Sequence, residues 1–143
     1  MARNIPIIKI YDNLLVSIQI ELSDHLVNEL KDNITDEIQN TNPKGLIIEV
    51  SGIDILDSYI ARSIRDISQI AKLMGVRSVI SGLDPAMAVT LVEMGLYLTG
   101  TDTALNLEAA IYMLEENKRG QEIDLEEIMD EVTHSNRERG TRP

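Results

Sequence analysis

The stretch that decides the fold is Leu46-Ile47-Ile48-Glu49-Val50-Ser51-Gly52-Ile53-Asp54-Ile55-Leu56-Asp57-Ser58-Tyr59-Ile60-Ala61-Arg62-Ser63-Ile64. It begins with an apolar, β-branched run between Gly45 and Ser51-Gly52, which predicts a strand covered on both faces. Apolar residues then recur at helical spacing, which predicts a helix beginning near Asp57 and Ser58. The expected inward face of that helix comprises Ile60, Ala61, Ile64, Ile67, Ile70 and Ala71.

Upstream of this stretch, the chain predicts a hairpin followed by a helix. Ile5–Tyr11 and Leu14–Glu21 are β-rich runs, and the turn formers Asp12-Asn13 separate them. Ser23 or Asp24 is then expected to cap a helix that ends at the loop of residues 41–45. The apolar residues of this helix, spaced for one face, are Leu26, Val27, Leu30, Ile34 and Ile38.

Downstream, the alternation of strands and helices continues. Gly75 should end the central helix, and Val76–Ser81 should form a fourth strand. Asp84 as N-cap and Pro85 as first helical residue predict a short helix, which Gly95 should close.

The end of the chain predicts one more strand, one more helix and a charged tail. Leu96–Thr99 is a candidate fifth strand, and the last helix of the domain should stop near Gly120. That helix is expected to turn Leu107, Ala110, Ile111 and Leu114 inward. In the tail, the amphipathic residues are Leu125, Ile128, Met129 and Val132. Residues 133–143 are expected to be disordered.

The expected order is ββαβαβαβα, an α/β fold with a mixed sheet of about five strands and about four helices. Its strand–helix–strand units should be parallel and right-handed, whereas the opening hairpin should be antiparallel.

Composition narrows the class of protein. The chain has 143 residues, no Cys and a net charge of −11, which suits one domain in a reducing cytoplasm. The negative charge argues against binding to nucleic acid or to a membrane surface. The chain shows no apolar run long enough to span a bilayer, and the spacing of its His and carboxylate residues predicts no metal site.

Ser58 is the candidate functional residue, because a hydroxyl at a helix N-terminus lies where negative charge is favoured. Ser is also a common N-cap, so a purely structural role is the alternative. If Asp57 is the cap, the Ser58 hydroxyl is free to accept a phosphate. Arg62 and Arg65 then stand at spacings that place them on the same helix face.

A small-ligand enzyme is a further alternative, in which Asp54 and Asp57 perform acid–base chemistry. Capping is the simpler explanation of these carboxylates. The loops also lack the glycine patterns of the phosphate-binding and dinucleotide-binding turns.

Three blocks of sequence carry a family resemblance. In chain order they are Ile5–Tyr11 with Leu14–Gln19, Ile53–Arg62 followed by Ser68–Gly75, and Gly82–Leu91. Together they resemble the STAS domain of anti-sigma-factor antagonists, and within that family the single-domain scaffolds of the bacterial stressosome. The resemblance assigns residues 5–119 to a STAS domain and leaves 120–143 as an acidic extension, partly helical or disordered.

The resemblance implies a non-enzymatic phosphoswitch without a cofactor. Such scaffolds self-associate, assemble with sensor-type STAS paralogues, and hold a switch Ser/Thr kinase until it phosphorylates them; a phosphatase resets the site. The matching phosphoacceptor is Ser58, with partner docking expected around Asp54, Asp57, Tyr59 and Arg62. Thr90 and Ser81 lie near a region where related sensor paralogues can carry a second phosphosite. A free-standing anti-sigma-factor antagonist remains the closest alternative.

Overall fold

The computed structural model describes the backbone of residues 5–19, 22–95 and 100–140, and their side chains except at 117–125 and 136–140. Its strands are β1 (Ile7–Ile10), β2 (Asn13–Ser17), β3 (Gly45–Glu49), β4 (Arg77–Ser81) and β5 (Asp102–Ala104). Its helices are α1 (Asp24–Thr41), α2 (Ser58–Leu73), α3 (Pro85–Glu93) and α4 (Leu107–Gly140). The predicted order ββαβαβαβα is therefore confirmed.

One mixed sheet carries the strands in the order β1-β2-β3-β4-β5. The β1–β2 pair is antiparallel, and the other neighbours are parallel, as the sequence predicted. Leu46, Ile47 and Ile48 of the central strand β3 are completely buried, which confirms the prediction of a strand covered on both faces.

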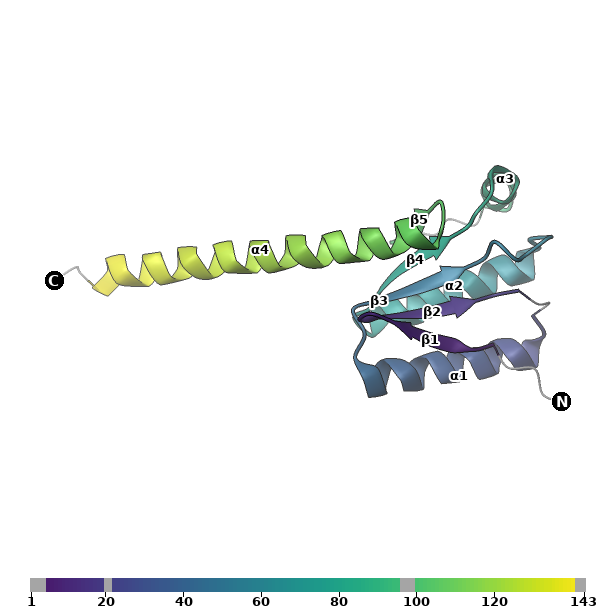
Figure 1. Cartoon of the computed structure of the whole chain (residues 1–143), viewed down its shortest axis with the longest axis horizontal. Helices are drawn as coiled ribbons and strands as arrows, with labels where there is room; N and C mark the ends of the chain where they lie inside the picture. Colours follow the sequence, from purple (N-terminus) through teal and green to yellow (C-terminus); the bar gives the residue numbers. More distant parts are fainter. Residues whose placement is uncertain (1–4, 20–21, 96–99, 141–143) are drawn as a thin grey trace.

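Helices cover both faces of the sheet. One face packs against α1, α2 and part of α3, through a core that includes Leu14, Ile48, Ile34 and Ile64. The other face packs against the beginning of α4, where Ala110 and Leu114 meet Ile47 and Val79. Figure 1 shows α4 continuing far past the sheet toward the C-terminus.

The opening hairpin turns one residue earlier than the sequence predicted. Ile10 pairs with Asn13, so the turn is Tyr11-Asp12 rather than Asp12-Asn13. Asn13 is buried as the first residue of β2, whereas Tyr11 is exposed and takes the unusual positive φ of 53°.

The fifth strand of the described sheet lies at residues that the sequence analysis did not assign to a strand. β5 is formed by residues 102–104, which pair with Val79–Ser81, while the predicted strand at 96–99 lies outside the described residues. The side chain of Asp102 accepts hydrogen bonds from Arg77, at the beginning of the neighbouring strand, which fixes this edge.

The last helix does not stop near Gly120, and residues 133–140 are helical rather than disordered. A glycine inside a helix costs only about 1 kcal/mol relative to alanine, and the residues around Gly120 are mostly good helix formers. None of the helices in the described ranges is both long and apolar enough to cross a membrane.

Candidate phosphoacceptor site

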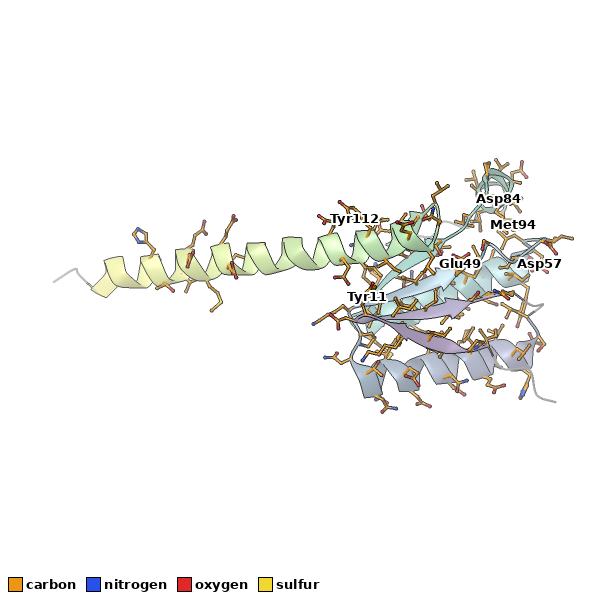
Figure 2. All side chains as sticks on the ribbon, viewed as in Figure 1. Tyr11, Glu49, Asp57, Asp84, Met94 and Tyr112 are labelled. Atoms are coloured by element: carbon orange, nitrogen blue, oxygen red, sulfur yellow. The ribbon has the colours of Figure 1, made fainter. Side chains whose placement is uncertain are left out.

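The loops that follow the parallel strands β3 and β4 lie at the same edge of the sheet. β3 leads into the loop of residues 50–57 before α2, and β4 leads into the loop of residues 82–84 before α3. Figure 2 shows Glu49, Asp57 and Asp84 at this end of the molecule, away from the projecting part of α4. We call the loops and the first turns of α2 and α3 the carboxyl edge.

Asp57, and not Ser58, is the N-cap of α2. The Asp57 carboxylate accepts a hydrogen bond of 2.8 Å from the backbone N–H of Ile60, and Asp57 itself has an extended backbone. Ser58 is consequently the first helical residue and is exposed. Its hydroxyl makes no hydrogen bond with the described part of the chain. The hydroxyl thus lies in solvent at the positive end of the helix dipole.

The two arginines of α2 are placed differently. Arg62, one turn after Ser58, is exposed and forms no ion pair within the described residues. Arg65 is already engaged, because its guanidinium lies 3.6 Å from the carboxylate of Asp66. Of the two cations that the sequence pointed to, Arg62 is therefore the one available to a phosphate.

Tyr59 lies on the side of α2 that faces α1. The nearby carboxylate of Asp24 raises the pKa of Tyr59 above its usual value, and partial desolvation adds to the shift. Tyr59 and Arg62 line a groove between the two helices, which Asp24 and Lys31 border from the side of α1. The first two turns of α2 thus present a phenol and a guanidinium beside the exposed Ser58.

Glu49 connects the loop before α2 to the end of β4. One of its carboxylate oxygens accepts the backbone N–H of Ser51 at 2.8 Å, and the other accepts the hydroxyl of the buried Ser81. Gly82 lies so close that a Cβ there would be 2.6 Å from Glu49 Oε1. Sequence reasoning missed this role, although an acid at the end of an apolar strand was a visible signal.

The remaining predicted residues lie in or near the carboxyl edge. Asp54 is exposed in the loop before α2 and lines a shallow depression with Asp57 and Gln19. Thr90 lies on α3, where its hydroxyl donates to the carbonyl of Ala86. Ser81 is completely buried, which leaves its hydroxyl out of reach of a modifying enzyme.

Two carboxylates at the described carboxyl edge are engaged in hydrogen bonds within the fold. Asp57 caps α2, and Glu49 accepts hydrogen bonds from Ser51 and Ser81. No three His, Asp or Glu side chains of the described residues gather closely enough to hold a metal ion.

Comparison with known proteins places this geometry in a family. Residues 4–110 match the STAS domain family. The chain belongs to the STAS domain family. Its five-stranded mixed sheet is the STAS fold, as the sequence predicted.

Several relatives come from bacterial stress signalling. RsbS from Moorella thermoacetica, solved with the substitution S58E, shares 37% identity and superposes with a TM-score of 0.72, over 82% of this chain and 99% of that one. A chain solved in a study of the molecular architecture of the stressosome shares 38% identity, with a TM-score of 0.73, over 80% of this chain and 99% of its own. The predicted similarity to stressosome scaffolds is therefore confirmed.

The RsbT co-antagonist protein RsbRD of Bacillus subtilis is 26% identical over 107 residues, which is 74% of this chain and 38% of RsbRD. This chain thus spans about two fifths of the length of that curated relative.

Proposed function

We propose that this chain is a scaffold of a stressosome-type assembly in the bacterial cytoplasm, that it holds a switch Ser/Thr kinase, and that phosphorylation of Ser58 releases the kinase. The observation that carries the proposal is the exposed Ser58 hydroxyl at the first residue of α2, where Asp57 already provides the cap. The hydroxyl contributes nothing visible to the folded state, so its modification leaves the fold intact.

The Moorella RsbS structure supports the choice of Ser58. In that protein a glutamate replaces a serine that carries the same number, 58, and the two folds superpose over 82% of this chain. A glutamate adds negative charge where a phosphate would stand.

In the proposed reaction, the Ser58 oxygen attacks the γ-phosphorus of ATP bound to the kinase. The new bond joins this oxygen to phosphorus, the bond to the β-phosphate oxygen breaks, ADP leaves, and a group of the kinase takes the hydroxyl proton. The chain supplies only the nucleophilic oxygen, and it needs no cofactor or catalytic residue of its own.

The charge change explains the release. A phosphoserine adds about −1.5 to −2 charges, next to the exposed carboxylates of Asp54 and Asp57. The helix dipole and Arg62 favour this charge within the scaffold, whereas an acidic kinase surface would be repelled. We expect the kinase to dock on Asp54, Asp57, Tyr59 and Arg62.

The relatives suggest the other partners. RsbRD is a co-antagonist protein, and sensor-type proteins of that kind are the expected companions in the assembly, along with further copies of this chain. A dedicated phosphatase would restore the Ser58 hydroxyl.

Phosphosite mapping tests the proposal. The purified chain, incubated with its cognate Ser/Thr kinase and ATP, should gain one phosphate by intact mass, and peptide sequencing should place it on Ser58. Ser58→Ala should abolish the gain, whereas Thr90→Ala, which removes the alternative site on α3, should leave it unchanged. A phosphate mapped to Thr90 or elsewhere in the wild-type chain would refute the assignment.

A further inference from the structure

Helix α4 shows the same apolar spacing twice. Its first part packs on the sheet through Ala110, Ile111 and Leu114. About five turns later, at about 3.6 residues per turn, the same spacing returns in Ile128, Met129 and Val132. The second set, which we call the distal patch, therefore lies on the same side of the helix as the set that packs on the sheet.

The two sets differ in what covers them. Ala110 and Leu114 are buried, whereas Ile128, Met129 and Val132 are 55%, 69% and 54% exposed. Figure 1 shows the reason: the sheet ends, and α4 continues alone beyond it. The distal patch is an apolar helix face that no described part of the chain covers.

The charge around the distal patch indicates what could cover it. Residues 120–136 contain no Lys or Arg and six acids, namely Glu122, Asp124, Glu126, Glu127, Asp130 and Glu131. The last four of these acids are exposed, and helical spacing places them on the sides of α4 that the distal patch does not occupy. Glu126 and Asp130, like Glu127 and Glu131, stand at the i,i+4 spacing at which like charges repel.

A second copy of this chain is a poorer occupant, because it would bring another set of the same carboxylates against the first, and the Lys and Arg of α4 (Lys118, Arg119, Arg137 and Arg139) lie beyond the two ends of the patch. A cationic partner relieves the repulsion within α4 and covers the apolar side chains at the same time. We propose that the distal patch docks into an apolar strip, bordered by Lys or Arg, on a partner protein.

This site goes beyond the proposed phosphoswitch and does not depend on it. The match to the STAS domain family ends at residue 110, before the distal patch begins. The Moorella RsbS aligns over 99% of its own length but over only 82% of this chain. The distal patch lies on the opposite side of the domain from the carboxyl edge that carries Ser58 (Figures 1 and 2).

A binding measurement with a defined probe tests the chemistry of the distal patch. The probe is a fluorescent peptide of Leu and Lys whose leucines follow helical spacing; the control peptide has the same composition in an order that leaves no apolar face. By fluorescence anisotropy, the full chain should bind the patterned peptide at least about tenfold more tightly than the control, with affinity falling as salt rises.

Substitutions on the full chain locate the binding. Ile128→Glu with Val132→Glu should weaken binding of the patterned peptide at least about tenfold. Ile128→Ala with Val132→Ala should also weaken it, and because alanine favours helix, that loss cannot come from an unfolded α4. The matched control is Val89→Glu with Val92→Glu, which changes two exposed valines of α3 and should leave the affinity within about twofold.

Three results would overturn the proposal. The first is equal binding of the two peptides, and the second is an equal loss in the patch and α3 variants. The third is sedimentation equilibrium showing that the wild-type chain dimerises and that Ile128→Glu with Val132→Glu makes it monomeric, which would assign the patch to a second copy.

Discussion

Asp57 and Ser58 are neighbours with different tasks. The helix needs a side-chain acceptor at its beginning, and the Asp57 carboxylate provides it at 2.8 Å from the Ile60 nitrogen. Ser58 follows at a position where the backbone N–H has no partner within the helix, so added negative charge there is stabilised. An aspartate cap immediately before the serine leaves the Ser58 hydroxyl exposed and outside the helix cap, as the proposed phosphorylation requires.

A substitution pair separates charge from shape at Ser58. Ser58→Asp should weaken binding of the cognate kinase by about tenfold or more, because it adds a negative charge beside Asp54 and Asp57. The asparagine of Ser58→Asn has nearly the same shape as the aspartate of Ser58→Asp but no charge, so this variant should bind the kinase within about twofold of the wild type. Isothermal titration calorimetry measures both, and equal losses in the two variants would show that shape, and not charge, controls docking.

At the scale of elements, helix beginnings set by adjacent residues were predicted well, whereas a short strand set by contacts distant in sequence was not. The beginning of α3 was predictable because an Asp followed by a Pro is a local signal for an N-cap and a first helical residue. In the structure, the Asp84 carboxylate accepts a hydrogen bond of 2.8 Å from the backbone N–H of Met87. β5 at residues 102–104 was not predicted, because a strand of three residues is decided by its neighbour β4 and by the Arg77–Asp102 contact, which no local pattern reveals.

The candidate site divides in the same way. The cap of α2 depends on residues adjacent in sequence, which left Asp57 and Ser58 as alternatives; the structure selects Asp57 and leaves Ser58 exposed. The role of Glu49 depends on register, because Glu49 pairs across the sheet with Ser81. That pairing becomes visible only when β3 and β4 are aligned in parallel, so propensity and spacing within either strand alone could not predict it.

The packing of α4 on the sheet depends on one glycine. A Cβ at position 45 would lie 2.7 Å from the methyl groups of Leu114 and 2.8 Å from Asn13 Oδ1. Gly45→Ala should therefore lower the free energy of unfolding by about 1–3 kcal/mol, the usual cost of overpacking, as measured by urea denaturation.

Gly52→Ala is the matched control for this prediction. Its added methyl group meets mainly the side chain of the exposed Gln19, which can move aside, so the loss should be clearly smaller. An equal loss in the two variants would mean that α4 does not sit tightly against the amino-terminal end of β3.

At the scale of the whole molecule, the chain consists of a packed STAS domain and a helical arm that grows out of it. The first turns of α4 belong to the core, where Ala110 and Leu114 are buried. Farther along, the described side chains at 126–134 are all exposed. We therefore expect the domain to end near residue 119, although the helix itself does not end there.

Truncation tests this division between domain and arm. A chain ending at residue 119 keeps Leu114 and should unfold in urea with a free energy within about 0.5 kcal/mol of the full chain, because exposed side chains add little stability. A chain ending at residue 112 loses Leu114, which is only 6% exposed, and should be destabilised by about 2–5 kcal/mol. The slope of the urea transition should also stay nearly constant in the first truncation, since that slope reports surface buried in the fold. A large loss of stability on removing residues 120–143 would instead make the arm part of the folding unit, and its projection into solvent would then need another explanation.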